Sequence, residues 1–164
     1  MSNFYNFVEI NRFMTITPRK LNTFAMFKLP SAYLCGVRTT YIDSDKCKVA
    51  VRHRWINQNP FKSMFWAVQG MAAEFSTGAL MMMKIKESGK PISMLVVGNE
   101  SAFTKKATGL ITFECHDGKL IDEAIEKAIE TGEGQTLWMT SVGTNEEGQE
   151  VSTFRFQWSI KVKN

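Results

Sequence analysis

The segment that most constrains the fold of this chain runs over residues 65–83 and carries one charged side chain, Glu74. Its length is close to what a bilayer span requires. However, Gln69, Ser76 and Thr77 add polar groups to it, and a carboxylate in lipid is costly. Segments with the pattern of strands follow it. We therefore expect a long helix buried in a protein core, not a membrane span.

Alternating apolar and polar residues predict about six strands around this helix. We place them at residues 35–42, 47–55, 94–103, 109–115, 136–144 and 151–163. A helix that is apolar on nearly every side must be covered on nearly every side, and a twisted antiparallel sheet does this economically. The predicted fold class is α+β, with one long central helix wrapped by the sheet.

The rest of the chain is predicted to add short helices to one domain spanning residues 1–164. Residues 1–30 form a helical extension with two segments, 4–14 and 17–28. Thr17 can cap the second segment, Pro18 fits its first position, and Pro30 is expected to end it. An amphipathic helix covers residues 119–131 and stops at Gly132.

Charge and cysteine usage narrow the class of protein. A net charge of +4 is too small to indicate a nucleic-acid partner. Cys35, Cys47 and Cys115 are odd in number and lack paired spacing. Charged residues interrupt the apolar N-terminal segment, so no signal peptide is expected. These features together predict a reduced, cytoplasmic location.

Glu74 is the most informative candidate for chemistry. A carboxylate in an otherwise uncharged helix loses solvation, so its ionised form becomes costly. A buried carboxylate in a folded domain usually has an ion-pair partner or a functional role. Glu74 is therefore either a general base or nucleophile facing a cleft, or the partner of a basic side chain.

The start of the long helix is the second candidate. Asn59 followed by Pro60, or Ser63, are two possible starts. Either leaves unpaired N–H groups that can polarise a thioester carbonyl or bind phosphate, and plain capping is the alternative. Gly70 and Gly78 share a helix face with Glu74, which permits a thin ligand or close packing against the sheet.

Other common sites are not indicated. The two histidines, His53 and His116, form no metal-ligand pattern, and His53 is expected to face the core. No metal is expected. The basic pair Lys105-Lys106 is either solvated surface or a contact for the phosphates of coenzyme A.

The order Asn59, Ser63-Met64 and Glu74 resembles the helix region of hot-dog thioesterases of the phenylacetate-degradation type, and most closely their relatives in the DUF4442 group. Segments 47–51 and 102–109 and the closing hairpin also match. The resemblance implies that Glu74 is the base or nucleophile toward a thioester. It implies that Asn59 positions water or the carbonyl and approaches the carboxylate of the other subunit. A homodimer or a dimer of dimers follows.

The sequence departs from this pattern at Phe65-Trp66, where many members have His-Gly-Gly. Two hypotheses remain. One is an acyl-thioester (acyl-CoA-like) hydrolase, in which coenzyme A enters only as part of the substrate and no other cofactor is needed. The other is a non-catalytic hot-dog module that holds an acyl chain or another apolar ligand. The expected substrate-binding residues are Ser63, Met64, Phe65, Trp66, Gly70, Lys105 and Lys106.

Overall fold

The computed structural model describes residues 15–163. In chain order its elements are α2 (Pro18–Lys28), α3 (Pro30–Leu34), β1 (Arg38–Ile42), β2 (Cys47–Arg52), the short 3-10 helix η1 (Trp55–Asn57), α4 (Trp66–Ser88), β3 (Ile92–Phe103), β4 (Leu110–Cys115), α5 (Gly118–Thr131), β5 (Gln135–Thr144) and β6 (Glu150–Val162). The helix expected at residues 4–14 lies outside the described residues. No helix within residues 15–163 is long and apolar enough to cross a bilayer.

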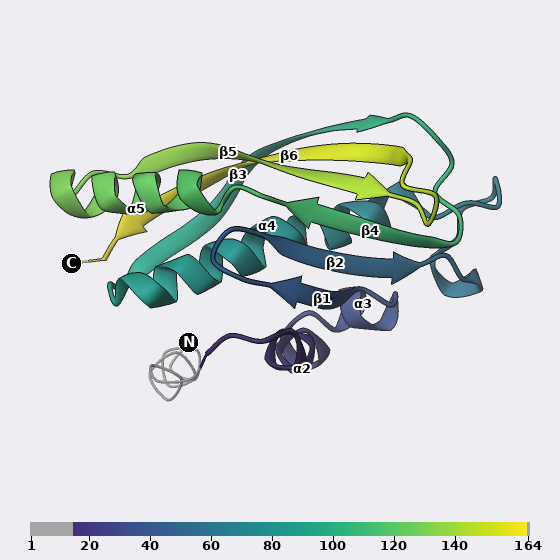
Figure 1. The fold of residues 1–164 in the computed structure, drawn as a ribbon, viewed down its shortest axis with the longest axis horizontal. Coiled ribbons are helices and arrows are strands. Elements are labelled where there is room, and N and C mark those ends of the chain that lie inside the picture. The colour runs from purple at the N-terminus through teal and green to yellow at the C-terminus, as the bar shows by residue number, and fades with distance from the viewer. Residues whose placement is uncertain (1–14, 164) are drawn as a thin grey trace.

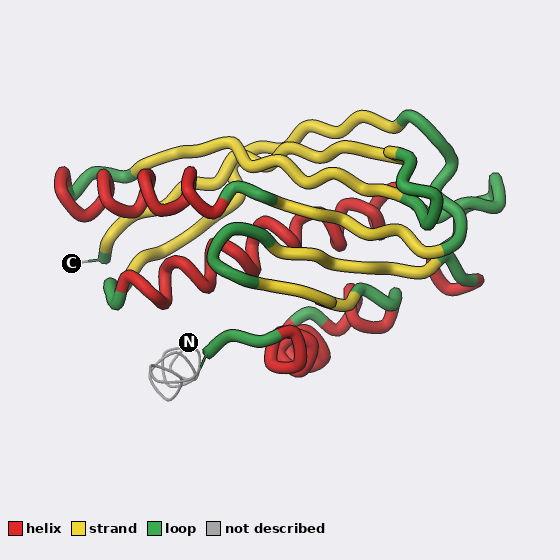
Figure 2. Tube along the Cα trace, viewed as in Figure 1, coloured by secondary structure: helices red, strands yellow, loops and turns green. Residues whose placement is uncertain are grey.

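The six strands form one sheet in the order β1-β2-β4-β5-β6-β3, and every neighbouring pair is antiparallel. The sheet curves around α4, which lies along one of its faces (Figure 1). The same view coloured by secondary structure shows α5 near the end of β5 and the pair α2–α3 beside β1 (Figure 2). The predicted α+β fold with a long helix wrapped by six strands is confirmed.

Helix α4 is longer than its uncharged segment. It begins at Trp66 and runs to Ser88, and Gly89 ends it in the left-handed conformation with φ 66°. Apolar side chains at its centre, including Leu80 and Met81, are fully buried against the sheet. The extra turn carries Lys84, whose side chain is buried while its ammonium lies 2.7 Å from the carboxylate of Asp122 in α5. This ion pair lets a charged residue continue the helix.

The helix predicted over residues 17–28 is confirmed as α2, which ends at Lys28, and Pro30 opens the separate helix α3. Two strand boundaries need correction. The first strand begins only at Arg38. The second ends at Arg52, so His53 and Trp55 leave the strand, and the Trp55 side chain is 83% exposed.

The two edges of the sheet differ. At the β1 edge, the side-chain amide of Asn22 in α2 donates to the carbonyl of Thr39 at 2.9 Å and accepts from its N–H at 2.8 Å. One side chain thus takes the place of a neighbouring strand. At the opposite edge, β3 pairs only with β6, and Leu95 and Val97 are 65% and 50% exposed. The β3 edge is therefore the one left open to a further strand.

Candidate functional site

The backbone that leads into α4 is held by hydrogen bonds from two other segments. The N–H of Met64 donates to the carbonyl of Ala107 at 2.8 Å, and the N–H of Phe65 donates to that of Asn57 at 2.8 Å. Asn57 is itself buried and bonded to the backbone around it. The entrance of the helix is thereby fixed between η1 and the β3–β4 connection.

Neither predicted cap starts this helix. Phe65 occupies the N-cap position of α4, and no side chain among the described residues caps it. The first N–H groups of a helix have no acceptor within the helix. The Val68 N–H donates to the Phe65 carbonyl at 3.0 Å, so the N–H groups of Trp66 and Ala67 are the ones available at the helix end, where the dipole favours negative charge.

Asn59 and Ser63 instead close the loop that precedes the helix. The Asn59 N–H donates to the Ser63 carbonyl at 2.8 Å, and its amide oxygen accepts from the N–H groups of Phe61 and Ser63. Within residues 15–163, no hydrogen bond joins Asn59 to Glu74. Ser63 is buried beside Asn59, and Met64 is buried in the core.

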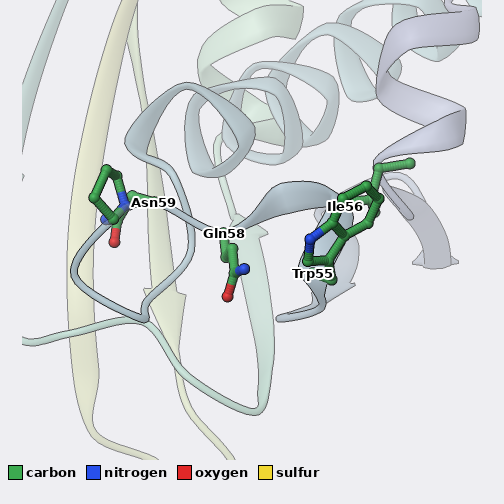
Figure 3. A pocket seen from close by; sticks show the side chains of 5 residues that line it. Trp55, Ile56, Gln58 and Asn59 are labelled. Atoms are coloured by element: carbon green, nitrogen blue, oxygen red, sulfur yellow. The ribbon is translucent and has the colours of Figure 1, made fainter.

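A hollow of about 390 Å³ lies outside this loop. It is lined by Trp55, Ile56, Gln58, Asn59 and Pro60 (Figure 3). It contains no residue of α4 and no ionisable side chain. The hollow is therefore a surface feature of the loop, separate from the helix carboxylate.

Glu74 lies on α4, partly buried. No hydrogen bond or ion pair engages its carboxylate within residues 15–163, so the predicted alternative of a basic partner is not met in this part of the chain. Burial raises the pKa of this carboxyl group. A carboxylate that lacks a partner and has a raised pKa is typical of an acid–base group.

The surroundings of Glu74 are set by one tryptophan. A Cβ placed at Gly78 would lie 3.3 Å from the Trp158 ring and 3.6 Å from Oε1 of Glu74, so ring and carboxylate flank the same point. The Trp158 indole donates to the Thr77 hydroxyl at 3.1 Å, and that hydroxyl donates to the carbonyl of Glu74 at 2.9 Å. This relay fixes the helix turn that carries the carboxylate.

The sheet leaves one face of α4 partly uncovered. Its residues recur at helical spacing and are Ala67, Gly70, Met71, Glu74 and Met82. Half-buried positions continue along the helix with Ile85 and Lys86, so Glu74 is the sole ionisable residue of this face as far as Met82. We call this set of five the open face of α4. Gly70 on it lies against Phe154, whose ring would be 3.4 Å from an added Cβ, so packing against the sheet uses the space that the glycine leaves.

The remaining predicted site residues lie around the helix entrance. The rings of Phe65 and Trp66 meet edge to face at 6.0 Å and are 44% and 56% exposed. Trp66 therefore points outward and does not plug the interior of its own chain. Lys105 and Lys106 are exposed, and Nζ of Lys106 is 3.5 Å from the carbonyl of Phe61, which brings this lysine to the entrance.

Two polar residues at the site were not singled out from the sequence. Gln69 is buried, donates to the carbonyl of Met64 at 3.3 Å and accepts from the Ser152 hydroxyl at 2.8 Å. It ties the first turn of α4 to β6. Thr77 carries the relay described above. Polar residues inside an apolar helix could have drawn attention to both positions, but the residues that they bond to are distant in the sequence.

No three histidine, cysteine or acidic side chains converge as metal ligands within residues 15–163.

An antiparallel sheet wrapped around one long central helix is the hot-dog architecture of α+β proteins. The chain belongs to the DUF4442 family, described as a domain of unknown function, whose model matches residues 17–160. A comparison with curated proteins finds no match.

Solved structures share the fold at low sequence identity. A protein of unknown function from Pseudomonas aeruginosa, described as a probable thioesterase, superposes with a TM-score of 0.80 at 19% identity, over 92% of this chain and 99% of that one. A thioesterase from Haemophilus influenzae gives 0.70 at 14% identity, over 90% and 92%. The PaaI protein of the E. coli phenylacetic acid degradation operon gives 0.60 at 12% identity, over 86% and 96%.

Proposed function

We propose that this protein is an acyl-thioester hydrolase, acting on an acyl-CoA-like substrate at a site shared between two copies of the chain. The observation that carries the proposal is Glu74, a partly buried carboxylate without a partner on the open face of α4. Burial moves the pKa of Glu74 upward. This brings it toward the range in which a general base can take a proton from water at neutral pH.

The N-terminus of α4 supplies the second part of the chemistry. Attack on a thioester carbonyl produces an oxyanion, and uncapped N–H groups at a helix end stabilise such a charge. The backbone N–H of Trp66 is the first of them. Asn59 holds the entrance loop in shape, and the second proton of its amide nitrogen is left to orient water or the carbonyl. Lys106 stands at the same entrance for a phosphate of the carrier.

The spacing along α4 supports a site made by two chains. Glu74 is eight residues beyond Trp66, which places them about 12 Å apart along the helix at a rise of about 1.5 Å per residue. One carbonyl cannot touch both groups. A second copy whose α4 runs in the opposite direction brings its own Glu74 toward the first helix entrance, and a two-fold axis makes two such sites.

The difference between the two sheet edges supports β3 as the binding position of the proposed second copy. Asn22 occupies the β1 edge, whereas β3 has a free edge with Leu95 and Val97 exposed. Pairing of β3 with its own copy joins the two sheets and brings the open faces of α4 together. Sedimentation of the variant Leu95→Lys/Val97→Lys tests this pairing. Each β3 edge then carries two positive charges, which repel those of the other copy, so the variant should be a monomer. Thr40→Lys on the exposed side of β1 is the matched control and should remain a dimer.

Hydrolysis of acyl-CoA and acyl-carrier-protein thioesters of varied chain length by the purified protein tests the activity. Turnover that requires Glu74 supports the hydrolase. The second candidate is a module that binds an acyl group without turning it over, and it is favoured by the bulky Phe65-Trp66 pair beside the donors. Saturable binding of acyl thioesters with no release of free thiol from any of them would establish that module and refute the hydrolase.

A further inference from the structure

The end of the molecule that holds the α4 entrance exposes large apolar side chains outside the proposed site. Trp55 is 83% exposed, Ile56 54% and Phe61 72%. Trp55 and Ile56 belong to η1, and Phe61 lies in the loop that follows. The hollow lined by Trp55, Ile56, Asn59 and Pro60 shows that η1 and this loop adjoin. In Figure 1 the loop after η1 projects beyond the strands at the end where α4 begins.

Cations accompany these apolar residues. Arg54 and Lys62 flank them in sequence, are exposed, and make no ion pair with any described residue. Lys62 has φ 59°, a left-handed conformation that is uncommon for a residue other than glycine. Lys106 reaches the same loop through the carbonyl of Phe61. We call Arg54, Trp55, Ile56, Phe61 and Lys62 the tip surface.

The acidic residues of this end do not cancel the positive charge of the tip surface. The β5–β6 turn brings Glu146 and Glu147 to it, and Arg52 pairs with Glu146 at 3.2 Å. Glu147 is the remaining acidic residue of that turn. Glu150, whose carbonyl accepts from the Thr104 hydroxyl next to Lys105, is a further exposed acidic residue. The four cations Arg54, Lys62, Lys105 and Lys106 outnumber these two carboxylates. The field at the tip is thus positive and suits an anionic surface.

We infer that the tip surface docks the protein on an anionic lipid bilayer. Tryptophan and phenylalanine favour the boundary between headgroups and acyl chains, and lysine and arginine bind anionic headgroups. The side chains that project are rings and an isoleucine, and the cations surround them. An acidic protein partner would use the cations but gives less reason for a tryptophan to project almost fully. The bilayer is therefore the occupant that the residues favour.

Cosedimentation of the full chain with lipid vesicles tests the docking. The protein should bind vesicles of phosphatidylcholine and phosphatidylglycerol in equal parts and bind pure phosphatidylcholine weakly. Trp55→Ala should weaken partitioning about tenfold or more, as expected for an aromatic ring withdrawn from an apolar layer. Lys62→Ala should weaken it about fivefold, and raising the salt should reproduce that loss.

Phe27→Ala is the matched control, because Phe27 is a ring of similar exposure, 70%, on α2 away from the tip. It should bind vesicles as the unaltered protein does. Tryptophan fluorescence should shift to the blue on binding, and Trp55→Phe should remove the shift. Hydrolysis of a soluble thioester should be unchanged in Trp55→Ala, so failure of docking is distinguishable from failure of the proposed activity.

Three outcomes would overturn the inference. One is equal binding to anionic and neutral vesicles, or none to either. Another is a Trp55→Ala/Phe61→Ala variant that sediments at half the mass of the unaltered protein, which would make the tip an interface between copies. The third is capture of a purified acidic acyl carrier protein through Trp55 while vesicles are ignored.

Discussion

Replacement of Glu74 by glutamine separates a catalytic carboxylate from a structural one. Glutamine keeps the size and most of the hydrogen bonding but removes the charge and the basicity. If Glu74 activates water, thioester hydrolysis should fall by about two to four orders of magnitude, the usual contribution of a positioned acid–base group. The kcat/KM of the unaltered enzyme should rise with pH through the pKa of Glu74, and this limb should disappear in the variant.

Glu74→Gln should leave the stability of the folded protein unchanged or raise it, whereas breaking a buried ion pair would lower it. Because burial raises the pKa of Glu74, the folded state holds the proton more tightly than the unfolded chain. Folding stability is therefore greatest below the unfolded pKa and falls as the pH rises through the folded pKa. At neutral pH the ionised form of the buried carboxylate therefore costs folding free energy. Glu74→Gln removes this cost, so the Tm at neutral pH should stay the same or rise.

Melting and hydrolysis measured on one preparation, at acidic and neutral pH, decide the question. Loss of activity with the Tm maintained supports the base. A Glu74→Gln variant that loses a few kcal/mol of unfolding free energy but keeps its hydrolysis rate per folded molecule would refute the reasoning. Such a result would mean that a cation from the second copy pairs with Glu74, because removing one member of a buried pair leaves the other charge uncompensated.

Three further expectations concern stability and reactivity. Gly143→Ala should lower the free energy of unfolding by about 1–3 kcal/mol, because the added Cβ would lie 2.5 Å from the Phe113 ring; an unchanged denaturation midpoint would contradict this. Asn22→Ala leaves both backbone groups of Thr39 unpaired and should cost about 1–3 kcal/mol in chemical denaturation, whereas an unaltered midpoint would show that water replaces the amide. Burial raises the pKa of Cys47 to about 12, so its alkylation at mildly alkaline pH should follow unfolding of the chain, and rapid labelling of the folded protein would argue against it.

Much of the fold follows from local pattern. The uncharged segment predicts the central helix because burial on all sides demands apolar residues, and period-two alternation locates all six strands. Their ends are less visible. The alternation in the second strand continues through His53 and Trp55, but the pairing with β4 ends at Arg52, followed by one last backbone bond from the His53 N–H to the Gly109 carbonyl at 2.8 Å. A hydrogen-bond ladder depends on the partner strand, which the pattern of one segment does not show.

The site is predictable only in part for the same reason. A single carboxylate in an apolar helix marks Glu74, and no residue within 15–163 pairs with it. The helix start was misplaced because Asn59 and Ser63 are good caps by residue type, yet they bond to each other across a loop. Lys84 is a second case in which the local sequence does not show the partner, because Asp122 lies on another helix.

The side-chain amide at position 22 has a consequence for assembly. A sheet with two free edges can add copies at both and grow without end. Among residues 15–163, Asn22 occupies the backbone groups of Thr39 on the β1 edge, which leaves β3 as the freer edge for another strand. Two copies joined there present only their blocked β1 edges outward. If copies associate by pairing of β3 as proposed, we expect the association to stop at two chains, because Asn22 occupies the backbone groups of Thr39 on each outer edge.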